Sequence, residues 1–324
     1  GALSGSAMAV AAMMGSSLLP EMRSRGYDRN LSIGALLAGA SLAPIIPPSV
    51  MAVVLGILSK VSIAALLIAG ILPGILLALA FFVYVVIRGR INPALAPVSA
   101  RSGLPARERL ALVTRALPFL LIIASILGFI LAGIATPTEA AAVGCVTAAI
   151  ICAIFGNLTW AKLVECVRST AGITTVITII MVSSVSFSQV LNMTGSTFKL
   201  VAAVTALDLH PAIMFILLQV LPFVLCMFID QIALMIMLVP LYGPIVLAMG
   251  FDPIWFWTIF LINMSIGGIT PPFGYTLFAL HGVTEDVPLQ SIFRSVLPFI
   301  GIFILVIGLL ALFPDIILFL PSFL

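Results

Sequence analysis

Residues 250–274 read GFDPIWFWTIFLINMSIGGITPPFG, an apolar run that follows Asp252 and is interrupted by Pro271 and Pro272. The same pattern, an aspartate followed by an apolar run and a double proline, occurs 224 positions earlier, in residues 26–50, GYDRNLSIGALLAGASLAPIIPPSV. A double proline removes backbone hydrogen-bond donors and prevents a continuous helix. Each stretch therefore predicts a helix that is broken about two thirds along its length, and the pair predicts an internal repeat.

The composition excludes a water-soluble domain. Hydrophobic residues make up 63% of the 324 residues and charged residues only 8%, with a mean hydropathy of +1.34. Apolar runs on the scale needed to cross about 30 Å of hydrocarbon, about 20 residues each, recur along the chain. They are Leu31–Leu58, Ile63–Ile87, Ala116–Ala135, Ala140–Phe155, Ile173–Val190, Pro211–Phe228, Ile232–Met249, Ile254–Leu280 and Ile292–Phe313. We predict an all-α, multi-pass membrane protein, because lipid-exposed backbone must satisfy its own hydrogen bonds.

The placement of the basic residues predicts the orientation of the chain. When alternate loops are assigned to opposite sides, only Lys60 and Lys199 fall on one side. The other twelve fall on the opposite side, which we predict to be cytoplasmic: Arg23, Arg25, Arg29, Arg88, Arg90, Arg101, Arg107, Arg109, Arg115, Lys162, Arg168 and Arg294. This assignment requires the segment before Gly26 and the segment 211–249 to enter and leave the membrane on one side. We therefore predict two re-entrant hairpins and two repeats of inverted orientation.

The repeat and the linkers suggest a division of the chain into five segments. We assign 1–59 and 210–283 to the two repeats, each a hairpin and a broken helix that together would form a transport domain. We assign 60–115 to a scaffold helix with a cytoplasmic linker, 116–209 to scaffold helices with an outer amphipathic segment, and 284–324 to a C-terminal transmembrane helix. Because Gly1 falls inside the first hairpin, we expect the natural protein to extend upstream.

Two acidic residues lie deep in apolar sequence, where an ionisable group is costly and usually functional. Asp230 falls where the second hairpin must turn and aligns with Ser6 of the first. It is a candidate ion or substrate contact, and a helix N-cap is the alternative. Glu139 follows Thr136 and Pro137, which favours a capping box over an ion ligand.

Other polar residues in the apolar runs have simpler explanations. The four cysteines lack a close CxxC pair, so we expect buried thiols and neither disulfides nor a metal site. The run 170–192 is rich in Ser and Thr, which indicates either contacts with a neighbouring helix or a wetted face.

The two proline breaks are the remaining candidate sites. Irregular backbone at membrane depth is tolerated where it lines a cavity, and half-helix N-termini there attract anions. Paired interrupted helices are typical of the binding site of a secondary transporter. A plain proline kink is the alternative for either break alone, but it does not explain two breaks at the same phase.

Five runs of this sequence together resemble a known family. They are GALSGSAMAVAAMMGSSLLPEMRSRGYD, PIIPPS, GIATPTEAAAVG, FIDQIALMIMLVP and NMSIGGITPPFGYTLF. In this order they look like the large membrane subunit of tripartite ATP-independent periplasmic (TRAP) transporters, truncated at the N-terminus. The resemblance covers nearly the whole chain. One departure is Val10, where many members of the family have Asp.

The resemblance implies a fold, partners and site residues. It implies an elevator-type, sodium-coupled importer in the bacterial inner membrane, which works with a small membrane subunit and a periplasmic substrate-binding protein. It implies no cofactor other than sodium ions, which would lie between each hairpin tip and the neighbouring break. The implied sodium-binding residues are Ser4, Gly5, Ser6, Pro44, Ile46, Pro47, Ser49, Asp230, Gly267, Thr270 and Pro271. The expected substrate contacts are Ser4, Ser6, Pro48, Pro272 and Gly274.

Three other functions are weaker alternatives. A binding-protein-independent transporter of sodium and a carboxylate, or of another anion, with a related inverted-repeat fold is the nearest. An intramembrane enzyme is unsupported, because Ser4 has no His or Lys partner at midmembrane depth. A structural subunit would need no pair of broken helices. The expected substrate is a small organic anion, and dicarboxylates, keto acids, sugar acids and sialic acid all remain open.

Overall fold

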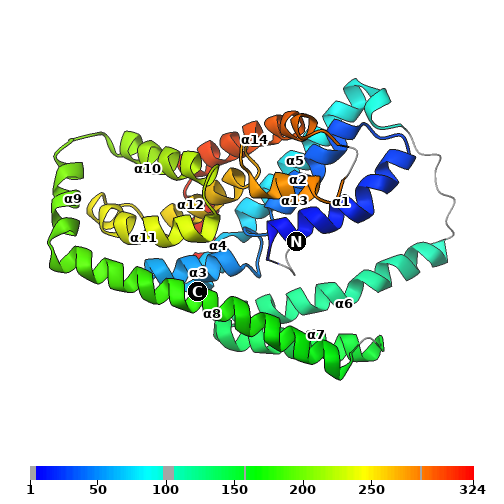
Figure 1. The fold of residues 1–324 in the computed structure, drawn as a ribbon, viewed down its shortest axis with the longest axis horizontal. Helices are drawn as coiled ribbons and strands as arrows, with labels where there is room; N and C mark the ends of the chain where they lie inside the picture. Colours follow the sequence, from blue (N-terminus) through cyan, green and yellow to red (C-terminus); the bar gives the residue numbers. More distant parts are fainter. Residues whose placement is uncertain (1–4, 98–105, 157, 285–286) are drawn as a thin grey trace. The chain divides into compact units, whose positions relative to one another are not determined.

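The structure is a computed structural model that describes residues 5–97, 106–156, 158–284 and 287–324. Every regular element in these residues is helical, as Figure 1 shows. Among them, five helices are long and apolar enough to cross a membrane. They are Ile63–Ile91, Pro137–Ile154, Trp160–Met193, Gln231–Ala248 and Leu289–Leu312. The predicted all-α membrane protein is therefore confirmed at this level.

The chain folds into two compact units. The first unit comprises residues 1–103, 209–235 and 251–324. Its elements are α1 (Ala7–Ser24), α2 (Arg29–Ser41), α3 (Val50–Ser59), α4 (Ile63–Ala69), α5 (Ile71–Ile91), η1 (Pro93–Leu95), α10 (Pro211–Cys226), the start of α11 (Gln231–Ala248), α12 (Pro253–Gly267), α13 (Tyr275–His281), α14 (Leu289–Leu312), α15 (Asp315–Leu318) and η2 (Pro321–Phe323). The second unit, residues 104–208 and 236–250, holds α6 (Ala106–Leu131), α7 (Pro137–Ile154), α8 (Trp160–Met193), α9 (Ser196–Thr205) and the rest of α11. The functional division into a transport domain and a scaffold stays a prediction.

The internal repeat is visible in the helix boundaries. The first helices of the two copies, α1 and α11, begin at Ala7 and Gln231, and the next pair, α2 and α12, begin at Arg29 and Pro253. Both intervals are the 224 positions that separate the two double prolines. The predicted breaks are confirmed, because α2 and α12 both end before the prolines and the chain resumes helix only at α3 and α13.

Local chemistry explains these boundaries. Asp28 and Asp252 are the N-caps of α2 and α12, and their carboxylates accept hydrogen bonds from Leu31 N at 2.8 Å and Trp255 N at 2.9 Å. Upstream of each cap lies a glycine in the left-handed region, where the preceding helix has ended. At Gly26 the amide donates to the Arg23 carbonyl and the next amide to the Met22 carbonyl, which is a Schellman motif. The sharp turn between the two helices of each copy is therefore encoded locally.

The core of the first unit is built on α12. Its side chains are buried from Trp255 through Gly267, so it is surrounded by protein along most of its length. It packs against α10, α14, α4 and α3. Helix α1 of the first copy packs against α13 of the second, and α14, which follows the second copy, packs against α2. The approach of α14 is close, since a Cβ at Gly34 would lie 2.3 Å from the Ser295 carbonyl oxygen. The two copies therefore share one core.

The second unit is an extended set of helices with little buried surface. Thr136 and Glu139 form the predicted capping box at the start of α7, with Thr136 N donating to Glu139 Oε2 at 2.8 Å. Helix α8 begins at Trp160, thirteen residues before the start of the predicted apolar run at Ile173. Its hydroxyls mostly donate to carbonyls of their own helix, but Ser184 Oγ donates to the carbonyl of Ile236 in α11 at 3.1 Å.

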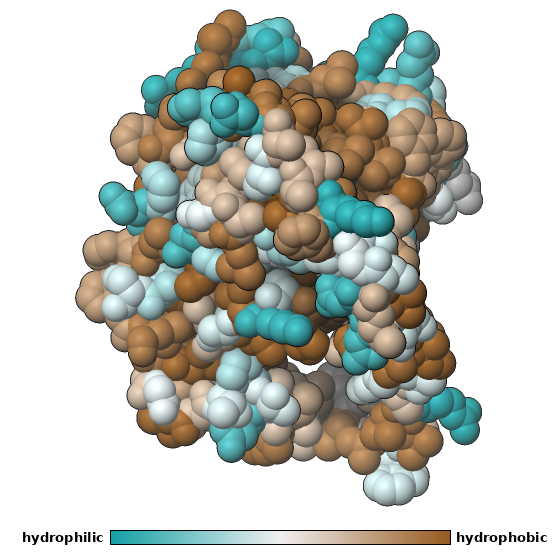
Figure 2. All heavy atoms as spheres, turned by 90° about the vertical axis from the view of Figure 1, so that its left-hand side faces the viewer, coloured by the Kyte–Doolittle hydropathy of each residue, from teal (hydrophilic) through white to brown (hydrophobic). Residues whose placement is uncertain are grey.

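The expectation of four buried thiols is wrong for three of them. Cys145, Cys152 and Cys166 are exposed, and only Cys226 is buried. A cysteine in a membrane protein does not need a protein core, because lipid also offers an apolar environment. Apolar side chains likewise cover much of the face drawn in Figure 2, with hydrophilic side chains in scattered patches. Such a surface suits a bilayer and would be unfavourable in water.

Candidate functional site

The candidate site consists of the tips of the two predicted hairpins, each next to a helix break. Residues 5–6 and 227–230 form the tips, and residues 42–49 and 268–274 form the breaks. All four segments belong to the first unit.

The first tip contains Gly5 and Ser6, while Ser4 lies outside the described residues. Gly5 has a φ of 59°, in the left-handed region that favours glycine. Ser6 is the N-cap of α1, and its hydroxyl accepts a hydrogen bond from Ala9 N at 3.3 Å. A Cβ built on Gly5 would lie 3.2 Å from Val50 Cγ2. The tip therefore touches the start of α3, directly after the break.

The first break is stabilised by Ser49. Its hydroxyl donates to the carbonyl of Pro44 and accepts from Ala52 N, so it both closes the break and caps α3. The Pro47–Pro48 peptide bond is cis. Pro44, Pro47 and Ser49 are buried, and Ile46 and Pro48 are half-buried. The structure thus places Gly5 against Val50, the residue that directly follows the predicted sodium-binding segment 44–49.

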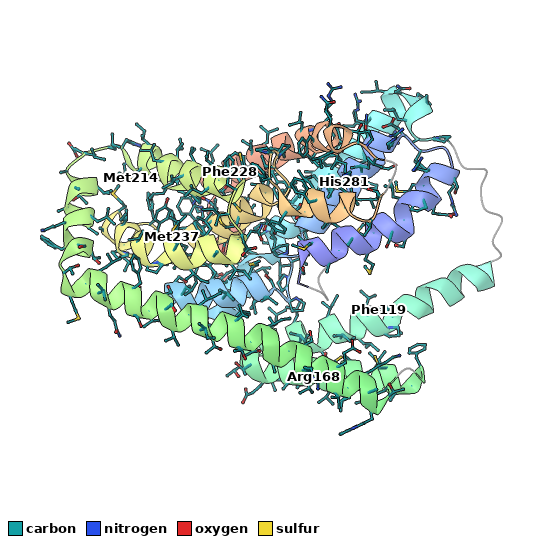
Figure 3. The ribbon with its side chains drawn as sticks, viewed as in Figure 1. Phe119, Arg168, Met214, Phe228, Met237 and His281 are labelled. Carbon is teal, nitrogen blue, oxygen red and sulfur yellow. The ribbon has the colours of Figure 1, made fainter. Side chains whose placement is uncertain are left out.

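At the second tip, Asp230 is exposed and acts as the N-cap of α11. One carboxylate oxygen, Oδ1, accepts hydrogen bonds from Ile232 N at 2.9 Å and Ala233 N at 3.3 Å. The capping alternative is therefore confirmed as a structural role. A capping carboxylate keeps a second oxygen for other partners, so an ion contact stays a prediction. Next to it, Phe228 lies with its ring centroid 5.6 Å from that of Phe273 in the break (Figure 3).

The second break folds back on itself around two carbonyl groups. Gly274 N donates to the Thr270 carbonyl at 3.1 Å, and Thr276 N donates to the Gly268 carbonyl at 3.2 Å. The Thr270 hydroxyl donates to the Ile266 carbonyl at 2.7 Å. The Pro271–Pro272 peptide bond is cis, as in the first break. Gly267, Thr270 and Gly274 are buried, Pro271 is half-buried and Pro272 is exposed.

Sequence reasoning missed the side chains that connect the second tip to its break. Gln231 Nε2 donates to the carbonyl of Met264 at 2.5 Å, and Cys226 Sγ donates to the same carbonyl at 3.3 Å. Both side chains are buried. The search for intramembrane acids passed over these neutral groups. A neutral amide inside an apolar run, such as the Gln in FIDQIAL, is the signal that could have found Gln231.

A second pair of amide side chains connects α10, the first limb of this hairpin, to α12. Asn263 Nδ2 donates to the backbone carbonyl of Gln219 at 2.6 Å and to its side-chain Oε1 at 3.1 Å. Both residues border an apolar cavity of about 690 Å³ between α10, α12 and α14. None of the predicted site residues lines this cavity. Size alone therefore does not locate the candidate site.

The electrostatics of the tips and breaks restrict what they can bind. No Lys or Arg occurs in residues 5–6, 42–49, 226–231 or 263–276 of the sequence. The available groups are backbone carbonyls, hydroxyls, amides and one carboxylate, and oxygen ligands of this kind suit hard cations. An anion would have to be held without a cationic side chain at these positions.

A multi-pass helical membrane protein with two discontinuous helices in corresponding places belongs structurally with the secondary transporters. The family model described as the DctM component of the tripartite ATP-independent periplasmic transporter matches residues 1–316. The chain belongs to this family of TRAP transporter large permeases, and it is a transport protein and not an enzyme.

Full-length relatives agree with this assignment. The ectoine TRAP transporter large permease protein of Halomonas elongata is 34% identical over 322 residues, which cover 99% of this chain and 74% of the relative. The C4-dicarboxylate TRAP transporter large permease protein of Pseudomonas aeruginosa is 32% identical, over 100% of this chain and 75% of the relative. The sialic acid TRAP transporter large permease protein of Vibrio cholerae is 32% identical, over 99% and 74%.

Proposed function

We propose that this chain is the membrane subunit that carries a small organic anion into the cell together with sodium ions. In this proposal it lies in the inner membrane and works with a periplasmic substrate-binding protein and a small membrane subunit. The two repeats have inverted orientation, and the hairpins and broken helices move as one body in an elevator motion. The observation that carries the proposal is the contact of a hairpin tip with a helix break in each repeat.

The sodium sites of this proposal lie between each tip and its break. At the first, Gly5 and Ser6 approach the break that ends at Ser49. At the second, Thr270 and Pro271 lie in the break, and Gly267 is the last residue of α12 before it. The oxygen-rich, cation-free composition of both places supports sodium as the ion. Asp230 would add a negative charge at the second.

The substrate class follows from the relatives and from the charge pattern. Relatives are named for ectoine, C4-dicarboxylate and sialic acid, all of which carry a carboxylate. In this chain such a group would meet no Lys or Arg at the tips and breaks. We propose that bound sodium and the N-terminus of α3 hold the carboxylate, with Ser6, Pro48, Pro272 and Gly274 around it. Sodium would then be required for substrate binding, which explains coupling.

The test is uptake into proteoliposomes that contain the complete transporter. The vesicles receive the full-length protein with its small subunit, and the binding protein is added outside with a radiolabelled ligand identified from that binding protein. An inward sodium gradient should accelerate uptake, and a potassium gradient of the same size should not. Equal rates in both gradients would refute sodium coupling. Uptake at the same rate without the binding protein would favour the binding-protein-independent alternative.

A further inference from the structure

The backbone carbonyl of Met264 holds both limbs of the second hairpin. Cys226 is the last residue of α10 and Gln231 is the first residue of α11, so they stand on either side of the tip. Their side chains converge on one carbonyl oxygen, at 3.3 Å and 2.5 Å. Met264 lies in the last turn of α12, just before the break. This carbonyl is therefore the point at which the tip is fastened to the broken helix.

Two glycines make this contact possible. A Cβ at Gly267 would lie 2.4 Å from Cys226 Cβ, and a Cβ at Gly268 would lie 2.9 Å from Gln231 Nε2. Each glycine faces one limb of the tip. Since contacts between carbon atoms are normally about 3.5–4.0 Å, any side chain at Gly267 would separate the tip from the break. The backbone is thus shaped for the approach that the two hydrogen bonds then hold.

Gln231 has a property that a merely packed residue would lack. Its side chain is 1% exposed and its Nε2 is hydrogen-bonded, but its Oε1 is buried without a hydrogen-bond partner among the described residues. A buried amide with one unpaired end is costly, and a leucine or methionine would avoid that cost. The equivalent position in the first repeat, 224 residues earlier, is Ala7. The amide is therefore not required by the repeat fold itself.

We propose that Gln231 is a positioning residue for transport: it latches the second hairpin tip onto the Met264 carbonyl and so sets the geometry of the adjacent ion site. Closing the latch and binding sodium stabilise the same arrangement, so each favours the other. This inference rests on the sodium coupling proposed above. Loss of the latch should weaken sodium binding without changing the rate at saturating sodium.

The test compares Gln231→Met with Gln219→Met in the full-length, reconstituted transporter. Methionine keeps the length of glutamine but removes both the donor and the oxygen. Gln219 is a matched control because it is also buried in this hairpin, and the bond from Asn263 to its backbone carbonyl survives the substitution. We expect Gln231→Met to raise the half-saturating sodium concentration roughly two- to tenfold, the equivalent of one hydrogen bond. The control should stay at the wild-type value.

Cys226 provides a second readout that does not depend on transport. When Cys145, Cys152, Cys166 and every cysteine of the transporter outside these 324 residues are changed to Ser, a membrane-permeant maleimide can react only with Cys226, which is 2% exposed. In sodium-free buffer, Cys226 should react roughly two- to tenfold faster in Gln231→Met than in the control, because the tip detaches from α12. Added sodium should slow the reaction in both proteins. If Gln231→Met does not accumulate in the membrane, Gln231→Asn, which keeps the amide one methylene short of Met264, takes its place.

The outcomes separate the latch from the proposed function. Equal alkylation of Cys226 in Gln231→Met and the control would overturn the latch. Faster alkylation with an unchanged half-saturating sodium concentration would overturn its role in the ion site. A higher half-saturating concentration with unchanged sodium-free alkylation would make Gln231 an ion ligand through Oε1, which also overturns the latch. Sodium-independent uptake by the wild type would refute the proposed function, whereas Cys226 alkylation would still report the latch.

Discussion

Gly267→Ala should separate the second tip from its break by a known amount. The new Cβ would lie 2.4 Å from Cys226 Cβ and 2.7 Å from Cys226 Sγ. The distance between the two Cβ atoms is about 1 Å or more below the normal contact distance of carbon atoms, about 3.5–4.0 Å. Cβ of Cys226 is fixed to its backbone, so rotation of the side chain cannot relieve the contact. The tip must therefore move away by about 1 Å.

The size of the effect follows from two opposing terms. Overpacking of a well-packed site costs about 1–3 kcal/mol. Alanine is favoured over glycine by about 1 kcal/mol inside a helix, but Gly267 is the last residue of α12, so we count about half of this gain. The net cost of about 0.5–2.5 kcal/mol corresponds to a roughly two- to seventyfold rise in half-saturating sodium. Sodium-dependent uptake by the reconstituted transporter measures it. Gly301→Ala is the control, because nothing lies within 4 Å of a Cβ at that exposed position in α14.

A double-mutant cycle tests whether this contact is the cause. Cys226→Ala removes Sγ but leaves Cβ, so it should not rescue Gly267→Ala. Cys226→Gly removes both atoms, and the double variant should return to within about threefold of Cys226→Gly alone. Wild-type sodium dependence in Gly267→Ala, or equal rescue by both Cys226 variants, would refute the reasoning.

Three other predictions address charge, motion and orientation. Asp230→Asn keeps the cap of α11 but removes the charge. Sodium activation of uptake should therefore weaken, while the amount of folded protein in the membrane stays the same. Unchanged sodium activation would mean that Asp230 only caps the helix. Cysteines at Gly5 and Val50 would have Cβ atoms 3.9 Å apart, within the range of about 3.5–4.5 Å for a disulfide. Because Gly5 is itself a predicted sodium-binding residue, the reference is the reduced double-cysteine protein: oxidation should change its uptake less than about twofold, since the proposed elevator motion moves the tip and the break together. Loss of uptake on oxidation, restored by reduction, would contradict the single moving body. In a cysteine-free protein, a single cysteine near Arg107 should be labelled only from the cytoplasm, and one near Phe251 only from outside. Labelling of both from the same side would contradict the inverted repeats.

The breaks and caps could be predicted from sequence because their causes are local. A double proline ends a helix wherever it occurs, so Pro47 and Pro271 locate the breaks without knowledge of the packing. The capping box of Thr136 and Glu139 depends only on residues three positions apart. Because the two copies are 224 residues apart, each feature predicted in one copy could also be predicted at the equivalent position of the other. These parts of the prediction needed no tertiary information.

Other features depend on information that residue types do not carry. The start of α8 at Trp160 was missed because Lys162, Glu165 and Arg168 end the apolar run but do not end a helix. The partner of Gln231 was missed because it is the backbone carbonyl of a residue 33 positions away. Every residue has a carbonyl, so nothing in the sequence distinguishes that of Met264.

The two repeats preserve backbone geometry and differ in the chemistry of their tips. Both have an aspartate cap, a left-handed glycine and a break with a cis proline at the same spacing. At the tips, however, Ser6 and Ala7 of the first copy stand where the second copy has Asp230 and Gln231. Equal backbone geometry gives the two copies equivalent breaks, whereas, on the proposed function, the side chains would decide how strongly each break holds an ion. The charge of Asp230 and the amide of Gln231 belong to the second tip alone. The contribution of each tip to coupling therefore has to be measured separately, and results at one cannot be transferred to the other by symmetry.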